Sequence, residues 1–311
     1  MMMKLNGLTL AVLALAATTG AQATLTLPNV VSPNTGSSSA AFVAWTPLGG
    51  LDGTSLVINL GVNLGSFLAA SGTQGVPAGF VAAAGSLSAA STIANWNFST
   101  NVFTINGASQ SGTNAWSAQA SSFFATSGTN YKWGVIAADA GTGPLSATNT
   151  VRGQSMLFTG VTESYDTTNA NGAVAGGVAT TIDYFSNNNG LGTHTAGQNG
   201  ASTATSGPAF LGFAFAQGDV GNFGILDSDF LVAPGVTSRF TWATTASSPP
   251  GPTIFSIGAT YAAGANSLIP ASFTFDGSNL VYAVPEPGTY ALMLAGLAGV
   301  GYLVRRRRAG L

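Results

Sequence analysis

The sequence predicts a mainly β protein whose body is an antiparallel β-sandwich of jelly-roll-like type with one or two short helices. Short runs rich in Val, Ile, Phe, Tyr, Trp and Thr recur between Gly, Asn, Ser and Pro residues. Several runs alternate apolar and polar residues, as strands with one packed and one wet face do. The chain has no cysteine, so packing rather than disulfides must stabilise its core.

Residues 1–23 have the layout of a secretory signal peptide with a helical apolar centre. A basic residue near the start precedes the apolar stretch 8–17, which is too short for a comfortable membrane span. Ala21 and Ala23 provide a small-x-small cleavage site. We therefore expect the body, residues 24–284, to be exported; a retained N-terminal anchor is the alternative.

Residues 285–311 combine a proline-rich start, an apolar run and a basic cluster. The run from Tyr290 to Val304 is uncharged and, as a helix, spans about 22 Å against a hydrocarbon core of roughly 30 Å. It predicts a short transmembrane helix whose arginines stay in the cytoplasm while the body lies outside. The candidate processing residues are Pro285, Glu286 and Pro287, and the membrane stop is Arg305, Arg306, Arg307 and Arg308.

This order of motif, short span and basic end resembles the PEP-CTERM sorting signal of Gram-negative bacteria, over about the last 27 of 311 residues. The resemblance implies an exosortase, an integral membrane cysteine protease-transpeptidase, as the processing partner. It also implies transient anchoring in the inner membrane, a final place at the cell surface or in the extracellular matrix, and an association with exopolysaccharide or biofilm. The alternative is a plain C-terminal anchor without processing.

The body carries little charge. Between residues 24 and 284 there are three basic and nine acidic residues, which gives a net charge of −6. Without a basic patch, nucleic acid and anionic polymers are poor partners. A surface of Ser, Thr, Asn, Gln and Gly suits a hydrated polysaccharide matrix, although it also fits many secreted proteins of low charge.

Strands are expected throughout the body. Around residue 132, for example, Tyr131, Trp133 and Val135 share one face and Lys132 lies opposite. The predicted strands are Ala41–Trp45, Ser55–Leu60, Val102–Ile105, Tyr131–Ala137, Ser155–Thr159, Thr181–Phe185, Ala209–Ala216, Phe230–Ala233, Ser238–Trp242, Thr253–Ile257, Ser272–Phe275 and Asn279–Ala283.

Helix is a minority. Trp116, Ala120, Phe123 and Phe124 form one stripe of a short amphipathic helix, and a second helix is expected to start within residues 80–84. One two-sheet sandwich is the first choice; two smaller sandwiches divided near residues 186–207 are the alternative. Long loops are predicted at Asp166–Thr180, Ser186–Gly207 and Thr245–Pro252, the middle one flexible.

Catalytic residue types are scarce. The single histidine, His194, falls in the Gly/Asn-rich loop, where we expect an ordinary exposed side chain rather than a triad base or zinc ligand. Asp219, Asp227 and Asp229 cluster and are weak candidates for calcium, but turn and cap chemistry explains them better. The only glutamate of the body is Glu163, so paired carboxylates for glycoside hydrolysis have little support. No cofactor is expected.

The remaining specific hypothesis is glycan binding by exposed aromatic rings. These observations favour an exported, non-catalytic structural or interaction protein of the polysaccharide matrix. A carbohydrate-binding module is the alternative, and a secreted polysaccharide hydrolase is the third possibility. The available tryptophans are Trp45, Trp96, Trp116, Trp133 and Trp242.

Overall fold

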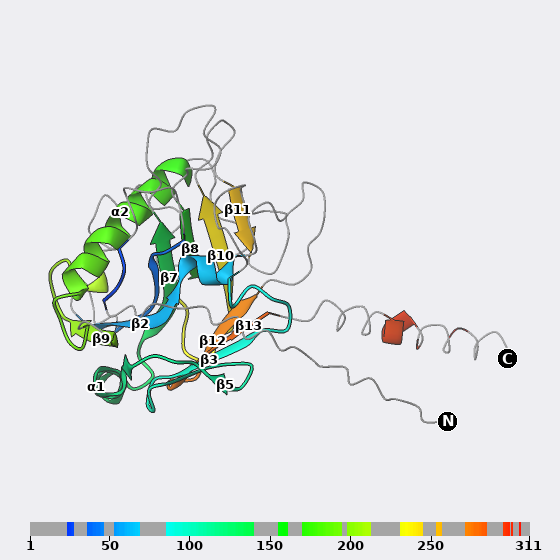
Figure 1. The fold of residues 1–311 in the computed structure, drawn as a ribbon, viewed down its shortest axis with the longest axis horizontal. Helices are drawn as coiled ribbons and strands as arrows, with labels where there is room; N and C mark the ends of the chain where they lie inside the picture. Colours follow the sequence, from blue (N-terminus) through cyan, green and yellow to red (C-terminus); the bar gives the residue numbers. More distant parts are fainter. Residues whose placement is uncertain are drawn as a thin grey trace, which may run out of the picture.

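Strands dominate the described part of the chain (Figure 1). The computed structural model describes residues 24–27, 36–46, 53–68, 85–139, 155–160, 170–194, 198–212, 231–244, 253–256, 271–284, 295–298, 300 and 305. The helices are η1 (Leu64–Phe67), α1 (Ser117–Ser127) and α2 (Ala170–Asn188). The strands are β1 (Ser39–Trp45), β2 (Ser55–Asn63), β3 (Ile93–Asn97), β4 (Val102–Ile105), β5 (Ala108–Ser109), β6 (Asn114–Ala115), β7 (Lys132–Asp139), β8 (Ser155–Gly160), β9 (Asn199–Ala204), β10 (Ser238–Thr244), β11 (Thr253–Ser256), β12 (Ser272–Phe275) and β13 (Asn279–Ala283).

These strands are hydrogen-bonded in the order β5-β4-β3-β13-β12-β10-β8-β7-β1-β2-β9-β6, and β11 pairs with β10. Every pairing is antiparallel except that of β6 with β9. Strand β10 pairs with β12 through only two residues, Ser238 and Arg239, and with β8 along its whole length. The sheet folds over at this narrow junction.

The fold brings two halves of the sheet face to face. We call β5, β4, β3, β13 and β12 the open half, and β10, β8, β7, β1, β2 and β9 the covered half. Phe42 of β1 lies 4.8 Å from Phe275 of β12, measured between ring centroids. The Trp96 indole N–H on β3 donates to the Leu60 carbonyl on β2 at 2.8 Å. The prediction of a mainly β protein with sandwich packing is confirmed.

Aromatic side chains fill the space between the halves. Fully buried Trp96 stacks on Phe103 with ring centroids 4.7 Å apart. Phe42 also contacts Phe98 at 4.9 Å, and Phe67 of η1 contacts Phe240 at 4.8 Å. This core supplies the apolar burial that compensates for the missing disulfides.

A second core lies on the outer face of the covered half, where α2 packs against β7 and β8 (Figure 1). Val43 of β1 and Ile136 of β7 are fully buried there, together with Tyr184 and Phe185 of α2. Strands β1, β7 and β8 are therefore buried on both faces. The prediction of one packed and one wet face is wrong for these strands, because a helix covers the second face.

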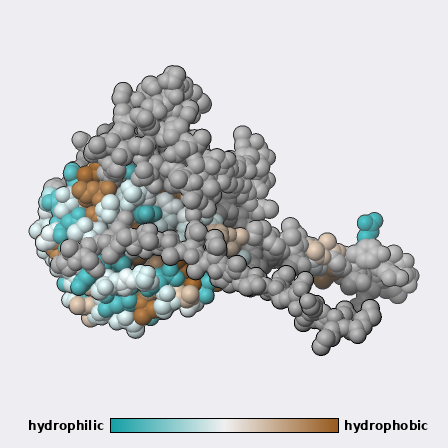
Figure 2. Space-filling model, viewed as in Figure 1, coloured by the Kyte–Doolittle hydropathy of each residue, from teal (hydrophilic) through white to brown (hydrophobic). Residues whose placement is uncertain are grey.

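The open half keeps the alternation that the sequence predicts. Residues of β13 alternate between half-buried and buried, and β12 and β3 follow the same pattern. Leu280 and Tyr282 point into the shared core, whereas Val281 lies half-buried on the outer face. On the view in Figure 2, hydrophilic and hydrophobic residues are interspersed over the described surface of the body.

Several predicted elements are corrected. Residues 181–185 are not a strand but part of α2, and the predicted loops 166–180 and 186–207 contain α2 and β9. The predicted strand at 209–216 is wrong at its start, because residues 211 and 212 are helical. Of the strand predicted at 230–233, the described residues 231–233 contain only a bridge at Val232. The helix expected from residue 80 and the loop 245–252 lie outside the described residues.

The predicted signal peptide, with Ala21 and Ala23, lies outside the described residues. So does the predicted membrane span, except for residues 295–298 and 300, which are helical and exposed, as is Arg305 just after it. Within the described ranges, we find no helix that is both long and apolar enough to cross a membrane.

Candidate functional site

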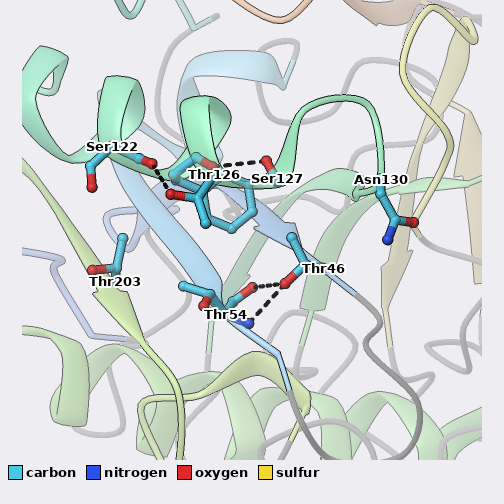
Figure 3. Close-up of a pocket in the computed structure, with 8 residues that line it drawn as sticks. Thr46, Thr54, Ser122, Thr126, Ser127, Asn130 and Thr203 are labelled. Carbon is cyan, nitrogen blue, oxygen red and sulfur yellow. Dashed lines mark hydrogen bonds between the residues drawn. The ribbon is translucent and has the colours of Figure 1, made fainter.

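A pocket of about 260 Å³ opens between α1 and the strands of the covered half (Figure 3). Helix α1 contributes one wall, the ends of β1 and β2 contribute the floor, and β9 contributes one side. None of its lining residues is charged, and all of them except Phe123 carry a hydroxyl or amide group. The lining residues are Thr46, Thr54, Ser122, Phe123, Thr126, Ser127, Asn130 and Thr203.

Hydrogen bonds hold the floor of the pocket in place. Thr46 is buried, its hydroxyl accepts the Thr54 N–H at 2.8 Å, and its own N–H donates to the Thr54 carbonyl at 3.0 Å. On α1, the Thr126 hydroxyl donates to the Ser122 carbonyl at 3.0 Å and the Ser127 hydroxyl to the Phe123 carbonyl at 2.8 Å. Such bonds to the preceding turn fix the rotamers of the two hydroxyl groups.

Asn101 positions helix α1 over the pocket. Trp116 precedes the helix but gives no side-chain cap. Instead, the Asn101 side-chain carbonyl accepts the N–H groups of Trp116 at 2.7 Å and Ser117 at 2.8 Å. Asn101 has a left-handed φ of 59°, which asparagine tolerates better than most residues. An asparagine distant in sequence thus accepts hydrogen bonds from two backbone N–H groups at the start of the pocket helix.

The chemistry of the pocket follows from its lining. Hydroxyl and amide groups both donate and accept hydrogen bonds, so they match a ligand that carries many hydroxyls. A charged ligand would lose its hydration without gaining a partner of opposite charge. Sequence reasoning missed this site, because its residues come from four separate elements. The available signal was the pair Ser122 and Thr126, which share one face of α1 behind the buried Phe123.

Most of the tryptophans considered as glycan platforms are internal, as tryptophans more often are. Trp96, Trp116 and Trp133 are fully buried, and each indole N–H donates to a backbone carbonyl. They are core residues, so the stacking hypothesis is wrong for these three. Trp45 is half-buried, and the side chain of Trp242 lies outside the described residues.

His194 is not the exposed loop residue that the sequence predicts. It follows α2, and its side chain is 4% exposed, with neither ring nitrogen bonded to a described residue. Burial lowers its pKa to about 4, so the ring is neutral at neutral pH. His194 is buried because the segment between α2 and β9 packs against the sheet. There the Thr193 N–H donates to the Ala201 carbonyl of β9 at 2.8 Å.

Acidic residues do not form a site in the described part of the chain. No group of three or more His, Cys, Asp or Glu there is suited to a metal ion. Asp219, Asp227 and Asp229 lie outside the described residues. Asp276 acts as a turn cap: burial opposes the change, but hydrogen bonds from Asn279 and Ser278 lower the pKa of its carboxyl.

The sorting motif follows directly on the last strand of the body. Strand β13 ends at Ala283, which pairs with Ile93 of β3 on one side and Ser272 of β12 on the other. The next residue, Val284, is 8% exposed and donates its N–H to the Thr92 carbonyl at 2.9 Å. Pro285, Glu286 and Pro287 follow at once, although they lie outside the described residues, as do Arg306, Arg307 and Arg308.

Residues 283–308 match the family model described as the PEP-CTERM protein-sorting motif. No curated protein and no solved structure gives a match to the chain. The resemblance seen in the tail is therefore confirmed. The motif marks the chain as a protein sorted for export by an exosortase-type system, with the cell surface or the exterior as its destination.

Proposed function

We propose that this protein is an exported, non-catalytic structural or interaction component of the extracellular polysaccharide or biofilm matrix. Its tail holds it briefly in the inner membrane, where an exosortase removes the segment after Pro285, Glu286 and Pro287. The observation that carries the proposal is the sorting motif at residues 283–308. The low charge of the body supports it, because such a surface stays compatible with a crowded, hydrated polymer.

Deletion of residues 285–311 tests the sorting route. The full-length protein should reach the cell exterior without its tail, which intact-mass measurement of the extracellular form would reveal. The deleted protein should instead remain in the periplasm as a soluble species. A mature extracellular form that keeps its arginines, or a deletion that leaves the destination unchanged, contradicts the proposal.

A second candidate function is carbohydrate binding, and the uncharged hydroxyl-lined pocket favours it. At about 260 Å³ the pocket is slightly smaller than the roughly 300–1,000 Å³ of most ligand sites, so it suits one sugar unit rather than a long oligosaccharide. Neutral sugars fit its chemistry better than uronic acids, because the lining offers no cation. This site differs from the surface of exposed tryptophans that the glycan hypothesis considered.

Two substitutions on neighbouring positions of α1 test this site. Ser122 lines the pocket, whereas Ser121 is exposed outside its lining. Ser122→Ala should weaken binding to dextran, a neutral polymer, about fivefold, as expected for one hydrogen bond. Ser121→Ala should leave binding unchanged. Affinity electrophoresis of the mature protein measures both; equal mobility of wild type with and without dextran and other neutral polymers contradicts the function.

A further inference from the structure

We infer that the body docks on its membrane-embedded processing enzyme through the surface from which the tail emerges. We call this surface the exit rim and define it as Ile93, Asn106, Gly107 and Ala283, which surround the end of β13. The inference rests on the proposed sorting route. It adds that the enzyme contacts the folded body as well as the motif.

The first argument is the length of the connecting chain. Val284 is the last residue held by a described hydrogen bond, and Pro287 lies only three residues beyond it. Even fully extended, three residues reach about 11 Å. The six residues from Val284 to Tyr290 reach about 22 Å, so the apolar run begins within that distance of the fold. An enzyme that binds Pro-Glu-Pro must therefore lie within contact distance of the exit rim.

The second argument is that β13 cannot easily detach from the sheet to lengthen the connection to the motif. It is an interior strand, paired with β3 along its whole length and with β12 through residues 280–283. Its residues Leu280 and Tyr282 are fully buried in the core between the halves. Peeling β13 away would break two ladders and expose both side chains. The motif is thus presented from a rigid support, and its first matched residue, Ala283, is itself part of the sheet.

The third argument is the chemistry of the exit rim. Ile93 is 53% exposed beside Ala283, its register partner, and its N–H is held by the Asn106 side chain at 2.8 Å. The turn at Asn106 and Gly107 is exposed and has positive φ at both residues. The rim has no charged residue, and the chain contains none between Asp52 and Lys132.

That composition favours a protein partner over a lipid surface. Binding to anionic headgroups relies on clustered Lys and Arg, and the rim has neither. The body carries a net charge of −6, which repels an anionic membrane. An uncharged patch centred on one exposed isoleucine instead suits an apolar contact on another protein.

A pair of matched substitutions tests the inference in the full-length protein. Ile93→Glu places a charge on the rim. Val102→Glu places the same charge on the same outer face of the open half, where Val102 is 42% exposed and pairs with Asn97 at the opposite end. Pulse-chase labelling with intact-mass analysis would give the rate of tail removal. We expect Ile93→Glu to slow it about tenfold, because a carboxylate would be desolvated without a partner, and Val102→Glu to leave it unchanged.

Wild-type rates for Ile93→Glu, or equal slowing by both substitutions, would overturn the inference. Sedimentation of the processed body, which has lost its tail, with vesicles that contain anionic lipid distinguishes the lipid alternative. If the wild-type body binds these vesicles and Ile93→Glu abolishes that binding, the rim binds lipid and the inference fails. If the wild-type protein never loses its tail, the proposed sorting route fails instead, so the two failures are separable.

Discussion

The covered and open halves of the sandwich share one core but differ in their outer faces. In the covered half, α2 and a second apolar core bury the outer face, so Val43 and Ile136 are fully enclosed. In the open half, the outer face carries side chains such as Asn95, Thr104 and Val281 that remain half-buried. The comparison teaches that alternation along a strand reports whether a second layer covers the sheet.

The two halves also differ in what they carry. In the open half, β13 leads into the tail, and none of the described helices covers the outer face. The covered half forms the floor of the hydroxyl-lined pocket and contributes to both apolar cores. The pocket and the second core therefore lie in one half, and the strand that leads into the tail lies in the other.

The same substitution in each half gives the largest expected contrast. Val43→Ala, on the outer face of β1, should lower the free energy of unfolding by about 2–3 kcal/mol, since it removes two buried methyl groups and leaves a cavity. Val281→Ala, on the outer face of β13, should cost about 0.5 kcal/mol. Urea unfolding of the exported body measures both. Equal losses would mean that the two outer faces are equally enclosed.

Acidification should lower the free energy of unfolding through His194, which is buried beside β9 in the covered half. Its pKa is about 4 when folded and near 6.5 when unfolded, so the unfolded chain binds the extra proton between these values. The stability contribution is complete above pH 6.5 and is lost as the pH falls toward 4, by about 2–3 kcal/mol between pH 7.5 and 4.5. His194→Leu should remove this loss. If His194→Leu and the wild type show the same pH dependence in urea unfolding, this role of His194 is contradicted.

Helix α1, which leans on the pocket side of the covered half, depends on Asn101. Asn101→Gly preserves the left-handed backbone but removes the carbonyl that caps two N–H groups, so we expect a loss of about 1–2 kcal/mol and weaker dextran binding. Asn106→Gly is the matched control in the open half, because it has a similar φ of 50° and holds only the Ile93 N–H. Equal effects of both on dextran binding would exclude a specific role for Asn101.

A smaller effect than at Asn101 is expected at the turn between β12 and β13 in the open half. Asp276 accepts the N–H groups of Ser278 at 2.9 Å and Asn279 at 2.7 Å. Asp276→Ala should cost about 1 kcal/mol at neutral pH. Because the folded pKa of this carboxyl is lowered, its contribution holds above the unfolded value near 3.9 and disappears in stronger acid. The two halves should thus lose stability in different pH ranges, which unfolding at pH 5 and pH 3 would resolve.

Much of the sheet was predictable because period-two patterns survive where one face stays open. Strands β4, β12 and β13 match their predicted bounds, and the stripe of Phe123 and Phe124 predicts α1. Helix α2 was not predicted, because its glycines favoured a loop. Its buried residues Val178, Thr181 and Tyr184 lie three apart, a helical stripe that competes with the alternation of Ile182 and Tyr184.

The site was predictable only where it is contiguous in sequence. The tail can be recognised in the sequence because its three parts follow one another within residues 285–311. The pocket gathers single hydroxyls such as Thr46, Ser122 and Thr203 from distant segments, and no local pattern encodes that meeting. His194 shows the same limit: its neighbours in sequence favour exposure, whereas pairing ahead of β9 buries it.

The ordered path of strands terminates at β5 and β6, which are two residues long each. Strands this short offer almost no backbone template on which a second copy could continue the ladder. Growth of a fibre by edge-to-edge addition at these termini is thereby discouraged. Among the described strands, β11 is a longer edge of four residues that pairs with β10, so addition of a second copy would have to use that edge instead.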